Sequence, residues 1–194
     1  NINLQQGLNL VGHISEPQNV AKVFEGMNVN WVKDAYGNLY VPDWEVNDIG
    51  NMQPGRGYWV NMGSAETLEW QSGQTGEEWS LEPGEMYTAN DALTNTGNNM
   101  NIIFPTEWFP EGSTIGARCS DIYVGEVIVD QSKPRMAMTV WGDDTETYST
   151  KDGCASNENI VYTIKTPTGS TGTVTFSGDA NTIYSEYLSN VVYV

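Results

Sequence analysis

The stretch AMTVWGDDTETYSTKDG, residues 137–153, joins a strand-like apolar run to two acidic turns. A Gly-Asp-Asp triplet at 142–144 ends the run. Adjacent carboxylates on a hairpin can hold divalent metal, but they can also accept hydrogen bonds from the amides of their own turn. A two-metal catalytic site needs carboxylates from several segments and a basic substrate channel, and this sequence offers no such channel. The pattern therefore favours a structural turn after a buried strand that ends at Trp141.

Calcium is the alternative for this stretch, because acidic side chains close together in sequence supply the hard oxygen ligands that Ca²⁺ prefers. The spacing does not match an EF-hand loop, which needs alternating acidic positions, a central glycine and a final glutamate. The candidate calcium ligands are Asp143, Asp144, Glu146 and Asp152.

Short runs rich in Val, Ile, Thr, Tyr and Trp recur along the whole chain, separated by Gly, Asn, Asp and Pro, and this predicts an all-β protein. One short helix is expected near residues 17–25, followed by Gly26 as its stop. Turn residues at 34–38 predict a hairpin. The run NVVYV at 190–194 has a strand pattern and is a candidate for pairing with a neighbouring chain.

The segment at 71–85 is rich in Gly, Glu and Ser and lacks a two-residue period, so we interpret it as the connection between two modules. An N-terminal β module is expected at 1–72, a connecting segment at 73–85 and a C-terminal β module at 86–194. Both modules are predicted to be small β-sandwich or barrel-like folds. A single sandwich with an exposed loop is the alternative.

The 194-residue chain is 39% hydrophobic with 25 acidic and 8 basic residues, a formal charge of −17. Such a field repels phosphate backbones, and the basic residues are scattered, so no nucleic-acid partner is expected. Apolar runs reach only four or five residues, far short of the roughly 20 that span a bilayer, so no membrane insertion is expected. No cofactor motif is present.

The chain has two cysteines and one histidine. Cys119 and Cys154 match no zinc or thioredoxin pattern, which leaves one disulfide or two buried thiols. We predict the disulfide, because both cysteines are expected in loops beside core strands of one module. His13 has no second metal-ligating residue near it in sequence, which favours a structural or merely exposed role.

No enzyme is predicted. The chain lacks the nucleophile elbow of serine hydrolases, and no pair of acidic residues stands out as a glycosidase pair.

The tryptophans fall into two groups according to the sequence around them. Trp31, Trp59 and Trp141 lie in strand patterns, which favours burial. Aromatic residues in loop-like stretches are the candidate partner contacts, to protein or to a glycan: Trp44, Trp79, Trp108 and Phe109.

The first module resembles a small β unit of marine phage virion proteins and bacterial surface proteins. The resemblance rests on GLNLVG at 7–12, VKDAYGNLYVP at 32–42 and IGNMQPGRGYWV at 49–60. Leu8 stands where the unit usually has Trp, a departure expected to change packing more than role.

The second module resembles the common companion of that unit, on TGNNMNI at 96–102, IGARCSDIYVGEVIV at 115–129 and the stretch at 137–153. The resemblance implies a non-enzymatic virion protein of a marine phage, such as a capsid decoration, knob or fibre component. It would act at the virion surface, oligomeric or repeated, through other virion or surface proteins. A secreted bacterial adhesin or carbohydrate-binding module is the alternative.

Overall fold

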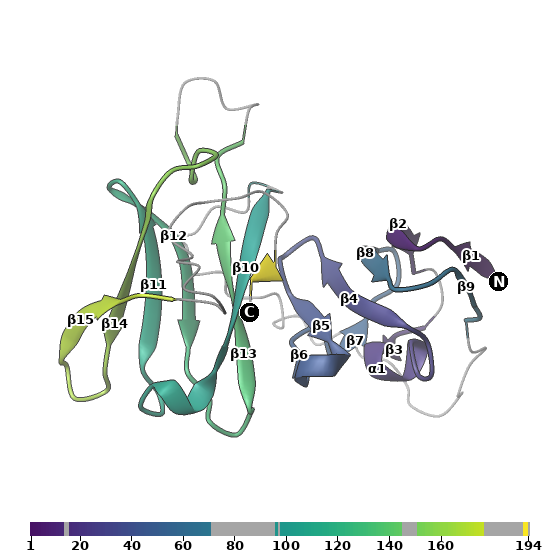
Figure 1. Cartoon of the computed structure of the whole chain (residues 1–194), viewed down its shortest axis with the longest axis horizontal. Coiled ribbons are helices and arrows are strands. Elements are labelled where there is room, and N and C mark those ends of the chain that lie inside the picture. The colour runs from purple at the N-terminus through teal and green to yellow at the C-terminus, as the bar shows by residue number, and fades with distance from the viewer. Residues whose placement is uncertain (14–15, 71–95, 97, 145–150, 177–191, 194) are drawn as a thin grey trace. The chain divides into compact units, whose positions relative to one another are not determined.

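A computed structural model of the protein describes residues 1–13, 16–70, 96, 98–144, 151–176 and 192–193 (Figure 1). The chain divides into two units, Asn1–Asn90 and Asp91–Val194. The segment expected to connect the modules lies outside the described residues. Strands dominate both units, which confirms the all-β prediction.

The N-terminal unit is built on a five-stranded sheet in which neighbouring strands are antiparallel. One short helix lies where the sequence predicts it, α1 (Val20–Val23), with Asn19 as its N-cap and Gly26 at a φ of 78° beyond its end. In spatial order the five strands are β2 (Gly7–Gly12), β8 (Gly57–Met62), β4 (Val29–Asp34), β5 (Leu39–Val41) and β6 (Val46–Asn47).

Smaller elements complete this unit. Two further strand pairs are β1 (Ile2–Leu4) with β9 (Glu66–Leu68) and β3 (Gln18–Asn19) with β7 (Asn51–Met52). A 3-10 turn, η1 (Pro42–Trp44), connects β5 to β6. The core combines Val20 and Phe24, from α1 and its C-terminal end, with strand side chains that follow the two-residue period: Leu4, Val11, Val29, Val32, Met52, Tyr58, Val60, Met62 and Leu68.

The predicted hairpin between β4 and β5 is confirmed, and Asp34 stabilises its turn. One carboxylate oxygen of Asp34 accepts hydrogen bonds from the amides of Tyr36 (2.8 Å) and Asn38 (2.9 Å), and the other accepts one from the Asn38 side chain (2.8 Å). The Arg56 guanidinium lies 5.0 Å from the centre of the Tyr36 ring. Turn chemistry visible in the sequence therefore becomes a fully bonded turn.

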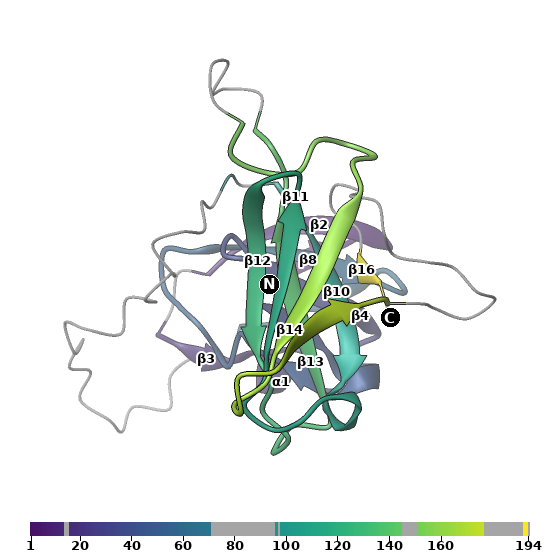
Figure 2. The same ribbon diagram turned by 90° about the vertical axis from the view of Figure 1, so that its left-hand side faces the viewer.

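The C-terminal unit has two sheets around one core. The first orders β13 (Arg135–Trp141), β10 (Asn99–Pro105) and β16 (Val192–Tyr193), and the second orders β12 (Ile122–Ile128), β11 (Thr114–Cys119), β14 (Ile160–Lys165) and β15 (Thr171–Val174). Figure 2 shows β12, β11 and β14 side by side. No sheet closes into a barrel over the described ranges, so these open sheets differ from the barrel-like alternative.

The two sheets of this unit contact each other where β12 lies against β13. Gly125 lies against the Thr139 carbonyl, so closely that a side chain at this position would collide with it. A short 3-10 turn, η2 (Thr106–Trp108), follows β10. The end of the NVVYV run pairs in parallel with β10 of its own chain, Val192 opposite Asn101. Pairing within the chain is therefore observed for this run.

The predicted disulfide joins Cys119 to Cys154, across a sequence separation of 35. Both residues are buried within the C-terminal core. The expectation that both cysteines lie in loops is wrong for Cys119, which is the last residue of β11. A cross-link placed in the core constrains the unfolded chain over the loop that it closes.

Candidate functional site

The acidic stretch after β13 forms a turn whose two sides are bonded to each other. Asp143 accepts a hydrogen bond through its carboxylate from the Asp152 amide (2.9 Å), and its own amide donates to the Cys154 carbonyl (2.8 Å). The Cys154 amide donates to the Trp141 carbonyl (3.0 Å). A side chain at Gly153 would collide with the Gly142 backbone, so glycine is required there. These contacts support the structural-turn interpretation.

The calcium hypothesis concerns the same place. Glu146 lies outside the described residues, so the four proposed ligands are not described together. Among the residues that the structure does describe, no group of three or more His, Cys, Asp or Glu side chains is arranged to hold a metal ion. One oxygen of Asp143 already serves the Asp152 amide. Calcium binding by this stretch stays a hypothesis.

The predicted partner contacts fall into different environments. The side chain of Trp108, in η2, is 57% exposed, whereas Trp44, in η1, is half-buried. Phe109 packs against the C-terminal core, 5.4 Å from Phe104 between ring centres. Trp79 lies outside the described residues. Trp108 is therefore the most accessible of these aromatic side chains within the described part of the chain.

Burial was predicted for the strand tryptophans, and the outcome differs for each. Trp141 is buried, as predicted, and Trp31 is half-buried. The prediction for Trp59 is wrong, because its side chain is 43% exposed. Its neighbour Tyr58 is 1% exposed and points into the core, and successive side chains of a strand point to opposite faces. The alternation places only one of this aromatic pair in the core.

Trp59 belongs to an exposed apolar face on the five-stranded sheet. Leu10 lies opposite Trp59 in the β2–β8 ladder, so both side chains point to the same side. Leu10 is 65% exposed and Leu8, two residues earlier on the same edge strand, is 59% exposed. We call the side of the sheet that carries these three residues the outer face. Exposed large apolar side chains that adjoin one another mark interaction surfaces more often than single exposed ones.

The outer face carries no acidic residue on β2, β8 or β4. The whole chain carries 25 acidic residues and a formal charge of −17. A partner that approaches here meets no carboxylate on these strands, so repulsion is lower than elsewhere on such a protein. Alternation and register place these positions on the outer face: Leu8, Leu10, Gly12, Trp31, Lys33, Gly57, Trp59 and Asn61.

Lys33 is the one basic residue among those positions, and it is 4% exposed. Burial lowers its pKa from 10.5 to about 8, against the opposing attraction of the neighbouring Asp34 carboxylate. Burial also raises the pKa of Asp34, although the Asn38 and Tyr36 hydrogen bonds and the Arg56 charge act in the opposite direction. β4 thus carries two buried ionisable groups at successive positions, Lys33 on the outer face and Asp34 on the opposite face.

His13 is fully buried, which excludes the merely exposed alternative. Its Nε2 lies 2.7 Å from the Glu16 carbonyl oxygen, and its ring centre lies 4.6 Å from that of Trp70. Its backbone exchanges hydrogen bonds with Gly55 and Arg56, which ties β2 to the turn before β8.

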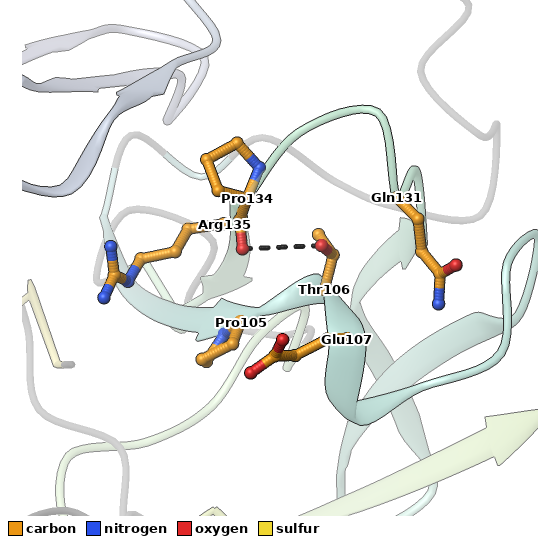
Figure 3. Close-up of a pocket in the computed structure, with 6 residues that line it drawn as sticks. All are labelled: Pro105, Thr106, Glu107, Gln131, Pro134 and Arg135. Atoms are coloured by element: carbon orange, nitrogen blue, oxygen red, sulfur yellow. Dashed lines mark hydrogen bonds between the residues drawn. The ribbon is translucent and has the colours of Figure 1, made fainter.

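A hollow of about 450 Å³ opens where β10 ends and β13 begins in the C-terminal unit. Thr106 is buried at its centre and donates a hydrogen bond from its hydroxyl to the Lys133 carbonyl (2.6 Å). The same hydroxyl makes a second, longer hydrogen bond to the Pro134 carbonyl (3.4 Å). Figure 3 shows Arg135 and Gln131 on opposite sides of this bond. The residues that line the hollow are Pro105, Thr106, Glu107, Gln131, Pro134 and Arg135.

Sequence reasoning missed both the outer face and the hollow. The strand alternation around Tyr58 and Trp59 was a usable signal for the face, because only one of the two can point into a one-sided core. The hollow had no local signal, because its two sides come from segments about 30 residues apart whose register is set only by the folded sheet.

Comparison with known proteins returns no match: no family model, no curated protein and no solved structure matches this chain. The described part of the chain contains no helix that could cross a bilayer.

Proposed function

We propose that this protein is a non-enzymatic structural component of a marine phage virion, assembled through protein–protein contacts at the particle surface. Capsid decoration, knob or fibre components are the roles that fit. The outer face of the N-terminal unit carries the proposal, because it exposes Leu8, Leu10 and Trp59 on strands without acidic residues. The partner that suits it is a neighbouring structural protein with an apolar patch of its own.

The cross-link in the C-terminal unit supports a location outside the cytosol. Disulfides form and persist in oxidising surroundings, which include the surfaces of virions and cells. The Cys119–Cys154 bond is buried, so it serves the stability of the fold. A particle component exposed to dilute medium benefits from such a constraint.

One observation favours the second candidate, a secreted bacterial adhesin or carbohydrate-binding module. Trp108 exposes its indole in the same 3-10 turn that supplies Glu107 to the hollow. A flat aromatic surface beside polar groups is a common arrangement for contact with a ligand. A virion component that contacts the host surface would use the same feature.

Immunogold electron microscopy of the native source tests the two candidates. An antibody against this chain is expected to label phage particles at regular positions. Label on the bacterial envelope, with particles unlabelled, would favour the adhesin. Label on neither would contradict both candidates.

A further inference from the structure

The hollow in the C-terminal unit is held open by backbone and buried contacts. Pro105 and Arg135 are the last pair of the β10–β13 ladder, so the two strands fix the spacing of its walls. Thr106 is 3% exposed, and its amide donates to the Pro134 carbonyl (3.2 Å). The site is therefore preformed, which lowers the entropic cost of binding a ligand.

Two charged side chains, Glu107 and Arg135, line the hollow. Within the described part of the chain, Glu107 and Arg135 form no side-chain hydrogen bond or ion pair, although both line the same space. Gln131 donates a hydrogen bond from its side-chain N–H to the Phe109 carbonyl (2.8 Å), and among the described residues its amide oxygen accepts none. The hollow thus offers a carboxylate acceptor, an amide acceptor and a guanidinium donor.

We propose that this hollow binds a neutral saccharide. Sugar hydroxyls both donate and accept, so one ring can donate to Glu107 and Gln131 and accept from Arg135. Carboxylate and guanidinium groups make paired hydrogen bonds, which suits neighbouring hydroxyls. The rings of Pro105 and Pro134 supply apolar surface for the C–H face of the sugar.

Other ligand classes fit less well. A purely anionic ligand would meet the Glu107 carboxylate and the −17 charge of the chain. A purely cationic ligand would meet Arg135. A lipophilic ligand would leave the charged groups desolvated without partners, which is costly. A volume of about 450 Å³ lies in the range of small-molecule sites, generally about 300 to 1,000 Å³.

This inference deepens the second candidate, the carbohydrate-binding module, and does not depend on the assembly role, because the outer face and the hollow belong to different units. The whole chain, fluorescently labelled, is applied to an array that carries neutral, sialylated and sulfated glycans. At least one neutral glycan is expected to bind. The strongest neutral ligand is then titrated by calorimetry against the wild type and variants.

Glu107→Ala and Arg135→Ala are each expected to weaken binding about tenfold or more, since hydrogen bonds to charged groups contribute about 1.5 to 3 kcal/mol. The matched controls on the same unit, Asp121→Ala and Lys165→Ala, remove exposed charges of the same sign and are expected to change affinity less than about twofold. Thermal melting verifies that each variant is folded.

Three results would overturn the proposal. The first is an array on which no glycan binds. The second is binding confined to acidic glycans, which would make the hollow an anion site. The third is a loss of affinity as large in the controls as in the hollow variants, which would show that the glycan binds elsewhere or through net charge. Self-association through the outer face would not change any of these three results, because the outer face belongs to the other unit.

Discussion

The two units bury their longest strands in different ways. In the C-terminal unit, β10 is buried at six successive positions, Asn99–Phe104, so both faces of the strand are covered. In the N-terminal unit, β8 alternates, with Tyr58 and Val60 buried and Trp59 exposed. The C-terminal unit covers β10 on both faces, although Trp108, Ile128 and Val161 are exposed elsewhere in it. The N-terminal unit exposes Trp59 beside Leu8 and Leu10 on its outer face.

The units also differ in what holds them together. The C-terminal unit has the Cys119–Cys154 bond and an aromatic cluster in which Phe176 lies 4.9 Å from Tyr162 and 5.5 Å from Phe104. The N-terminal unit has no cysteine and relies on hydrogen-bonded turns such as the one at Asp34. The C-terminal unit is therefore cross-linked covalently, whereas the N-terminal unit is held by packing and hydrogen bonds.

Among these changes, loss of the disulfide is expected to lower the free energy of unfolding the most. Replacing Cys119 and Cys154 together by Ala should lower the free energy of unfolding of the C-terminal unit by about 4 kcal/mol, because the closed loop restricts the unfolded chain. Chemical denaturation followed by near-ultraviolet circular dichroism measures this loss. Two alkylatable thiols in the native wild-type protein, detected by intact mass, would contradict the cross-link.

A pair of tryptophan variants sharpens the contrast between buried and exposed faces. Trp141→Ala should lower the free energy of unfolding by about 3 kcal/mol, because it leaves a cavity beside the turn. Trp59→Ala should cost less than about 1 kcal/mol, because its side chain is exposed in the isolated protein. Equal losses in thermal melting would mean that Trp59 is part of a core.

The lowered pKa of Lys33 predicts that the free energy of unfolding rises with pH. Its pKa of about 8 in the folded protein lies below the value of 10.5 in the unfolded chain, so between these values the unfolded state binds more protons. Stability should therefore increase by about 2 kcal/mol between pH 7 and 9.5. Lys33→Met should remove this increase. The free energy of unfolding is measured by urea denaturation at each pH. If it rises with pH in the variant as it does in the wild type, another group is responsible.

The aspartate turn predicts the smallest effect. Changing Asp143 and Asp144 to Asn keeps oxygen acceptors for the turn, so stability should move by no more than about 1 kcal/mol. Melting temperature should not depend on calcium in either protein. A calcium-dependent rise in the wild type that the double variant loses would establish metal binding, since a ligand of the folded state stabilises it.

Much of this fold follows from local sequence chemistry. The β strands, the helix that ends before Gly26 and the Asp34–Asn38 turn are visible because each depends on residues close in the chain. The disulfide followed from the cysteine count. The exposure of Trp59 did not follow, because a strand pattern does not say whether a second layer covers its outer face. The hollow depends on the pairing of Pro105 with Arg135, a long-range register.

Hydroxyl-radical footprinting of the assembled particle tests the central claim that the outer face is the assembly surface. Oxidation of Trp59 is compared between the isolated chain and the native virion, with Trp108 as the internal reference because both indoles are exposed in the isolated protein. We expect Trp59 to become protected in the particle while Trp108 stays reactive. Equal oxidation of Trp59 in both samples would contradict assembly through this face.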